Sequence, residues 1–142
     1  MEGTVNEPFT EEPLSEEPHP DIQATGIRRL INATRFSWQG FRAAYRSEEA
    51  VRQESFLIIF GTPLALWLGE TAMDKIALVG SLVLILVIEL LNTAVETTID
   101  RISHEIHELS GKAKDIGSAA VLITILLTIF IWGMIIYERF IA

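Results

Sequence analysis

The sequence predicts an all-α membrane protein with one amphipathic surface helix followed by three transmembrane helices. Apolar residues make up 49% of the 142-residue chain and the mean hydropathy is +0.34, values that are high for a soluble domain. Residues 116–137 form a run of 22 residues without a charge. Coiled into a helix, this run reaches about 33 Å, which is enough to cross the hydrocarbon core of a bilayer. A buried helix of a soluble protein rarely has so long an uncharged run, so this segment is expected to span a membrane.

The first 25 residues are expected to form a disordered acidic tail. Residues 1–21 contain seven acidic and no basic residues, and four of the five prolines lie in the first twenty positions. Such a segment has too little apolar surface to offset the entropy lost on folding, and it lacks the pattern of a signal peptide. The tail carries −7 of the net charge of −8, so residues 26–142 form a nearly neutral domain that we expect to be membrane-embedded. The acidic balance argues against nucleic-acid binding, and the absence of cysteine excludes disulfides.

Residues 27–46 have the pattern of a helix that lies on a membrane surface. Apolar and aromatic side chains recur there at spacings of three and four, and arginines gather along one flank of that stripe. The stripe consists of Ile27, Leu30, Ile31, Thr34, Trp38, Phe41 and Tyr45, and the flank consists of Arg28, Arg35, Arg42 and Arg46. A basic helix with one apolar face binds in the plane of the interface, which predicts a surface helix over 27–46.

Three segments are expected to cross the membrane, at about residues 51–69, 75–100 and 116–138. The first contains an uncharged run of 15 residues that is interrupted by Pro63, and it is long enough only if Arg52 extends toward the headgroups. The second begins with 13 uncharged residues, and its apolar pattern continues only if polar residues are accepted within the membrane.

Basic residues predict the orientation of these segments. Six arginines lie before or at the start of the first span, and three further basic residues lie in the 101–115 loop between the second and third spans. The opposite side has only Lys75 and Arg139. Because cytoplasmic loops carry an excess of Lys and Arg, the N-terminus and the 101–115 loop are expected to be cytoplasmic.

Four oxygen-bearing side chains form a stripe along the second span. Glu89, Asn92, Glu96 and Asp100 recur at helical spacing and fall on one face. A carboxylate inside a bilayer costs several kcal/mol, so such groups usually face a cavity, a partner or a cation. A stripe of this kind suits a hard cation such as Mg²⁺. The alternative, that the helix has already left the membrane and the stripe is solvated, is equally acceptable for Asp100 and much less so for Glu89.

Charged residues on either side of the stripe add two candidate regions. His104 and His107 invite a zinc interpretation, but no third ligand is evident. Lys112 and Lys114, with flanking glycines, could hold phosphate, although the pattern of a nucleotide-binding P-loop is absent. Residues 48–54 form a second charged cluster at the same expected depth in the membrane.

Three blocks of sequence resemble the small integral-membrane diacylglycerol kinase family of Gram-negative bacteria. The first combines residues 40–45 (GFRAAY) with 50–54 (AVRQE), the second is residues 88–101 (IELLNTAVETTIDR), and the third is residues 108–120 (ELSGKAKDIGSAA). The second and third blocks match in type and spacing, and the resemblance covers about residues 26–137. The sequence departs from the pattern at Tyr45, at Val51 and in the acidic extension.

The resemblance implies a homotrimer in the bacterial inner membrane, with a surface helix and three transmembrane helices per subunit and with active sites shared between neighbours. It also implies a reaction, the transfer of the γ-phosphoryl group of MgATP to the free hydroxyl of diacylglycerol, which produces phosphatidic acid. Glu89 becomes the general base in contact with the lipid, and Ser118 lies near the lipid. Glu48 and Glu96 become Mg²⁺ ligands that also position ATP. The remaining residues implied at the nucleotide are Arg29, Asn92, Asp100, Glu105, His107, Lys114 and Asp115.

Two other functions remain open at this point. The nearer one is phosphorylation of another lipid alcohol, as in the related undecaprenol kinases. The more distant one is an ion pathway that uses the carboxylates of the second span. A pathway needs polar residues through the far half of that span, where residues 76–88 offer only Gly80 and Ser81. The sequence therefore favours the kinase.

Overall fold

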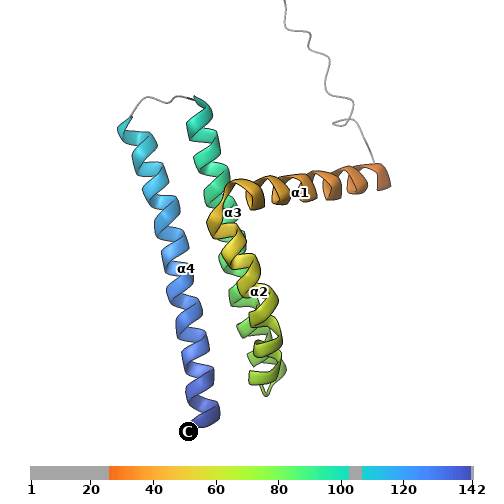
Figure 1. Ribbon diagram of the computed structural model, residues 1–142, viewed down its shortest axis with the longest axis vertical. Coiled ribbons are helices and arrows are strands. Elements are labelled where there is room, and N and C mark those ends of the chain that lie inside the picture. Colours follow the sequence, from red (N-terminus) through yellow and green to blue (C-terminus); the bar gives the residue numbers. More distant parts are fainter. Residues whose placement is uncertain (1–25, 103–106, 142) are drawn as a thin grey trace, which may run out of the picture. The chain divides into compact units, whose positions relative to one another are not determined.

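Four helices make up the part of the chain that the structure describes. The computed structural model covers residues 26–102 and 107–141, which form α1 (Ile27–Ser47), α2 (Glu49–Leu68), α3 (Ala72–Ile102) and α4 (Glu108–Phe140) (Figure 1). The expectation of an all-α chain is confirmed. The expected acidic tail, His104 and Glu105 lie outside the described residues.

The described chain falls into two units. Residues 26–37 hold the first part of α1, and residues 38–141 hold the rest of α1 and the other three helices. In the first unit the apolar side chains Ile27, Leu30 and Ile31 are exposed, Ile27 to 78%. In the second unit, Trp38, Phe41 and Tyr45 continue the stripe as a row of tilted rings whose centroids are 6.2 and 6.1 Å apart. Exposed apolar side chains at this spacing fit a helix that lies on a lipid surface.

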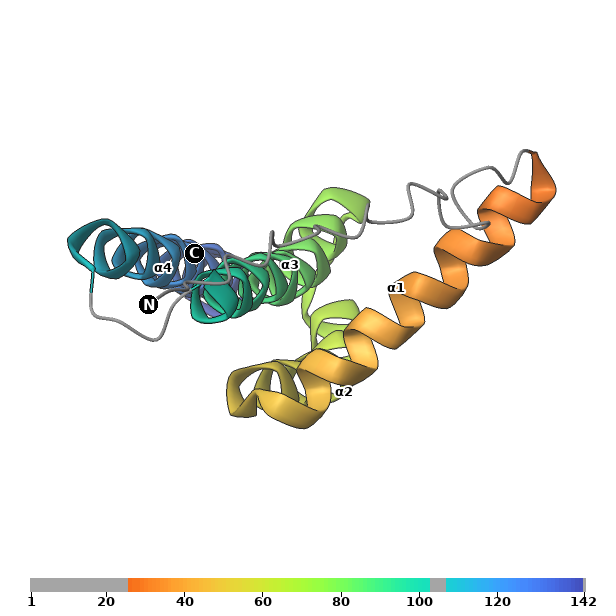
Figure 2. The ribbon, with the colours of Figure 1, turned by 90° about the horizontal axis from the view of Figure 1, so that it is seen from above.

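Helix α3 is the centre of the second unit. It packs against α2 on one side and α4 on the other, whereas α2 and α4 hardly contact each other. The turn of residues 69–71 makes α2 and α3 antiparallel, and α4 runs antiparallel to α3 (Figure 1). Seen from above, α2 and α4 occupy different sides of α3 (Figure 2). This arrangement leaves room between α2 and α4 along one face of α3.

The tightest packing lies near the α2–α3 turn. Ala65, Leu68 and Leu78 form the buried apolar cluster there, and side chains of α4 pack against it. Gly61 permits the close approach of α2 to α3, because a Cβ atom at that position would lie 2.7 Å from Leu82 Cδ1. This apolar cluster sits at one end of the helices, whereas Val51, at the start of α2, is buried apart from it.

Polar side chains form hydrogen bonds to the helix termini at this end of the bundle, which we call the Arg139 end. Asp74 Oδ2 accepts hydrogen bonds from the backbone N–H groups of Glu70 and Thr71, at 3.1 and 2.8 Å. The backbone N–H of Asp74 donates to Thr71 Oγ1 in return, which is a capping box at the start of α3. From α4, Arg139 donates to the carbonyl oxygens of Trp67 and Leu68 at the end of α2, and its guanidinium lies 4.8 Å from the Trp67 ring centroid. Arg139 thus supplies partners to carbonyls that the end of α2 leaves unpaired.

Most large apolar side chains of α3 and α4 are exposed, as is typical of helices in lipid. Phe130 and Ile123 on α4 are examples, at 64% and 65%. Such extensive apolar exposure is untypical of a soluble monomer. Among the described helices, α3 and α4 have the length and apolar composition needed to cross a membrane. Helix α2 does not reach that threshold, because Arg52, Gln53 and Glu54 occupy its first turns. The expected span at residues 51–69 therefore stays a prediction.

Candidate active site

The polar stripe lies on one continuous helix, and its members differ in burial. Glu89 is 7% exposed, Asn92 and Glu96 are half-buried, and Asp100 is exposed near the end of α3. The helix continues without a break to Ile102, so Glu89 lies more than three turns before its end. A buried carboxylate at that depth requires compensating charge or proton exchange.

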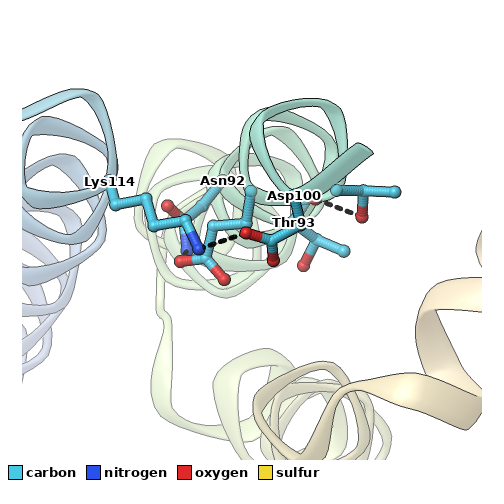
Figure 3. Close-up of polar contacts among 6 residues, drawn as sticks. Asn92, Thr93, Asp100 and Lys114 are labelled. Carbon is cyan, nitrogen blue, oxygen red and sulfur yellow. Dashed lines mark hydrogen bonds and ion pairs between the residues drawn. The ribbon is translucent and has the colours of Figure 1, made fainter. Parts of the chain in front are cut away.

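Asn92 is held between α3 and α4. Its Nδ2 donates to Glu96 Oε1 at 3.2 Å, while its Oδ1 is buried without a hydrogen-bond partner (Figure 3). A Cβ atom at Gly117 would lie 2.2 Å from that Oδ1. Glycine at position 117 therefore makes room for the Asn92 amide, and the amide orients Glu96.

A second contact joins the same two helices closer to their ends. Lys114 extends from α4 toward α3, and its Nζ lies 2.6 Å from Asp100 Oδ1 (Figure 3). Both side chains are partly exposed, at 37% and 56%. An ion pair with this exposure adds little stability.

Two carboxylates, Glu48 and Glu96, lie near Glu89. Glu48 occupies the connection between α1 and α2 in an extended conformation, and its side chain makes no capping hydrogen bond. Both carboxylates are near enough to Glu89 to interact with it electrostatically. We call this region, with Asn92 and Asp100, the carboxylate end of the bundle.

Glu54 is a site residue to which sequence reasoning assigned no role. Glu54 and Glu89 line the same cleft, which has a volume of about 450 Å³ and lies between α2 and α4. Glu54 Oε2 is buried and has no hydrogen-bond partner. The signal in the sequence was its helical spacing from Ala50 and Leu57, which places all three on one face of α2.

Other sequence-derived candidates occupy different positions. His107 precedes α4 and its Nδ1 accepts a hydrogen bond from the Leu109 N–H at 3.2 Å, so it caps that helix. Asp115 and Ser118 are exposed on α4, and Ser118 does not line the cleft. Arg29 is exposed in the first unit.

The donor set fits a metal ion that takes few protein ligands. The described residues contain no group of three acidic or histidine side chains that could hold a metal ion among themselves. Mg²⁺ is commonly bound through one or two carboxylates and completes its coordination with water and substrate phosphates. Glu48 and Glu96, which both lie near Glu89, are suited to that role, and Glu96 also interacts with the Lys114 cation.

Comparison with known proteins places this architecture in one family. The family model described as prokaryotic diacylglycerol kinase matches residues 35–136. The chain is 43% identical over 116 residues to a diacylglycerol kinase of Escherichia coli (strain K12), covering 82% of this chain and 95% of that protein. It is 46% identical over 115 residues to one from Haemophilus influenzae, covering 81% and 98%. A third relative, from Pseudomonas aeruginosa, is 40% identical over 118 residues, covering 83% and 96%. Matches of this extent show that the chain is a membrane protein of the prokaryotic diacylglycerol kinase family.

Proposed function

We propose that this protein is a lipid kinase that transfers the γ-phosphoryl group of MgATP to the free hydroxyl of diacylglycerol and releases phosphatidic acid. The observation that carries the proposal is the position of Glu89, a buried carboxylate at the head of an apolar cleft. A lipid approaching through the bilayer brings its hydroxyl to that depth while its chains remain among apolar side chains. Membership of the family supports the same activity.

Glu89 acts as the general base in this proposal. Its carboxylate accepts the proton of the lipid hydroxyl as the hydroxyl oxygen bonds to the γ-phosphorus, and the bond to the bridging oxygen of ADP breaks. Phosphoryl transfer depends mainly on positioning and on neutralising charge. Lys114 offsets negative charge on the phosphate groups, and Asn92 holds Glu96 in place through its amide.

Glu48 and Glu96 would hold Mg²⁺, which would supply positive charge against the phosphate groups of ATP. Their electrostatic proximity to Glu89 supports this assignment. The remaining nucleotide contacts proposed from the family pattern are Arg29, Asn92, Asp100, Glu105, His107, Lys114 and Asp115. Ser118 contacts the lipid near the membrane surface. His107 keeps its other ring nitrogen for a ligand, because Nδ1 already caps α4.

The protein is proposed to sit in the bacterial inner membrane as a homotrimer with shared active sites. Helices α2, α3 and α4 cross the membrane, with the N-terminus and the carboxylate end on the cytoplasmic side, where ATP is available. The exposed apolar surface of α3 and α4 and the excess of basic residues on that side support this topology. A trimer also encloses a carboxylate stripe that three helices by themselves leave open.

Lipid-dependent release of ADP by the purified protein tests the function. We expect release only when diacylglycerol, ATP and Mg²⁺ are all present, with loss on chelation of the metal. Undecaprenol supplied in the same micelles separates the two lipid alcohols, and faster turnover of undecaprenol would reassign the substrate. Ion flux through vesicles without ADP release would replace the kinase with a transport function.

A further inference from the structure

The connection between α1 and α2 consists of one residue. Helix α1 ends at Ser47 and α2 begins at Glu49, so Glu48 alone makes the turn, in an extended conformation (Figure 1). Its backbone N–H donates to the carbonyl oxygen of Ala44 at 2.8 Å. Ala44 and Val51, on either side of the connection, are both buried. The direction of the Glu48 side chain therefore depends on how the end of α1 is held against the start of α2.

Arg52 on α2 holds the end of α1. Its Nη1 donates to the backbone carbonyl oxygens of Tyr45 and Arg46, both at 3.3 Å. These carbonyls belong to the last turn of α1, where a helix leaves its C=O groups without partners inside the helix. A guanidinium also suits this position, because the C-terminus of a helix carries partial negative charge. Arg52 thus caps α1 from the neighbouring helix.

The same contact directs the Arg52 cation away from Glu48. The two residues are four apart in the sequence, a spacing at which Glu and Arg side chains on a helix can pair. In the part of the chain that the structure describes, however, Glu48 forms no ion pair. Glu48 is half-buried and near enough to Glu89 to interact with it electrostatically. A half-buried carboxylate without a cationic partner favours the binding of a cation from solution, since burial weakens its hydration.

We propose that Arg52 is a positioning residue of the metal site, which holds Glu48 in place for a divalent cation without contacting that cation itself. By capping α1, Arg52 fixes the one-residue connection that carries Glu48. Its guanidinium, engaged by the carbonyls of α1, does not pair with the Glu48 carboxylate. The proposal rests on the proposed function, in which Glu48 is a Mg²⁺ ligand, and adds a residue that acts through that ligand.

Replacing Arg52 tests the proposal through metal binding. Mn²⁺ accepts the same kind of oxygen ligands as Mg²⁺, and its binding to the full-length protein with a non-hydrolysable ATP analogue is measured by electron paramagnetic resonance. We expect Arg52→Ala to raise the Kd for Mn²⁺ by on the order of tenfold, as for the loss of a group that orients a metal ligand. The Mg²⁺ concentration for half-maximal activity should rise in parallel, while kcat at saturating Mg²⁺ changes less than about threefold. An unchanged Kd, or a loss of kcat that saturating Mg²⁺ does not restore, would overturn the proposal.

Arg139→Ala is the matched control. Arg139 also donates to two carbonyl oxygens at the end of a helix, those of Trp67 and Leu68, but none of the proposed metal ligands adjoins that helix end. This variant should be less stable than the wild type, yet its Kd for Mn²⁺ should stay within about twofold of the wild-type value, because the two sites are independent. An equal rise in Kd in both variants would show that Arg52 acts through general stability and would refute the proposal.

Glu48→Gln separates this proposal from the proposed function. It should itself weaken Mn²⁺ binding, and adding Arg52→Ala should then have no further effect, since both changes act through one ligand. Normal Mn²⁺ binding in Glu48→Gln would remove Glu48 from the metal site, and the role of Arg52 with it. Weak binding in Glu48→Gln with normal binding in Arg52→Ala would overturn this inference and leave the proposed function intact.

Arg52→Lys serves if Arg52→Ala does not fold. It keeps a positive charge at the connection but lacks the planar guanidinium. The same rise in the Kd for Mn²⁺ is expected, because a compact ammonium one turn from Glu48 can pair with it and compete with the metal. Wild-type affinity for Mn²⁺ in Arg52→Lys would refute the proposal.

Discussion

The two ends of the helix bundle differ in how completely their polar side chains are hydrogen-bonded. At the Arg139 end, Asp74 and Arg139 pair with helix-terminal backbone groups, and Ser81, Thr128 and Trp132 satisfy one another in the adjoining segment. At the carboxylate end, Glu89 is buried among other acids. The two buried side-chain oxygens without a hydrogen-bond partner in the described part of the chain, Glu54 Oε2 and Asn92 Oδ1, both belong there.

We interpret the polar groups of the Arg139 end as contributing to stability and those of the carboxylate end as contributing to function. A buried polar atom without a hydrogen-bond partner costs about 1–3 kcal/mol of stability, so its presence in the fold suggests a functional role. At the Arg139 end the polar groups stabilise helix termini and fix how α2, α3 and α4 pack. At the carboxylate end, two buried side-chain oxygens have no partner, which agrees with the proposed binding of nucleotide, metal and lipid. Substitutions at the Arg139 end should therefore lower the free energy of unfolding, and substitutions at the carboxylate end should lower turnover.

The largest expected effect is on turnover at the carboxylate end. Glu89→Gln keeps the shape of the side chain and removes its ability to accept a proton, so kcat should fall by about 10²–10⁴-fold. Nucleotide binding and the thermal unfolding temperature should be retained. The control is Glu70→Gln, the same change at an exposed position of the Arg139 end, which should turn over normally. Near-normal kcat in Glu89→Gln would remove the general base from the mechanism.

The next effect is on stability at the Arg139 end. Arg139→Ala removes charged hydrogen bonds to two carbonyls of α2 and a cation–π contact with Trp67. We expect the free energy of unfolding to fall by about 2 kcal/mol, measured by thermal unfolding in detergent micelles. Arg139→Lys keeps the charge, so its free energy of unfolding should fall by less. Because the site is remote, kcat below the unfolding transition should be unchanged; a large fall in kcat would mean that the two ends are coupled.

Gly117→Ala should affect both stability and turnover through one contact. The added Cβ would overlap Asn92 Oδ1, which must then move and release Glu96. Overpacking of this kind typically costs about 1–3 kcal/mol, and the Mg²⁺ concentration needed for half-maximal activity should rise. At Gly133 on the same helix a Cβ would meet nothing within 4 Å, so Gly133→Ala serves as the matched control. Equal behaviour of the two variants would contradict the proposed role of Asn92.

The smallest expected stability effect is at the ion pair of the carboxylate end. A double-mutant cycle of Lys114→Gln and Asp100→Asn should give a coupling free energy below about 1 kcal/mol, because both side chains are partly exposed. The KM for ATP should nevertheless rise in Lys114→Gln, since the cation is proposed to contact phosphate. A coupling energy of several kcal/mol with unchanged KM would make the pair structural, like those of the Arg139 end.

Local patterns in the sequence were sufficient for the all-α class and for the two helices that can cross a membrane. The uncharged run of residues 116–137 lies within α4, and the spacing of Glu89, Asn92 and Glu96 placed them on one face of α3. Both inferences follow from helical periodicity and hydropathy, which depend on near neighbours in the chain. The sequence predicts a span over residues 51–69 less clearly, because charges and Pro63 interrupt its apolar pattern.

Contacts between helices were decided only by the tertiary structure. Sequence spacing does not reveal that Gly117 makes room for Asn92, that Lys114 reaches Asp100, or that Glu54 shares a cleft with Glu89. Nor does it reveal that Ser118 lies outside the cleft lining and that His107 caps α4. The periodicity of a helix determines which residues share a face, whereas the rotation and depth at which two helices pack depend on side chains of both. The sequence alone therefore determined the chemical groups of the site, and packing around α3 decided which of them meet.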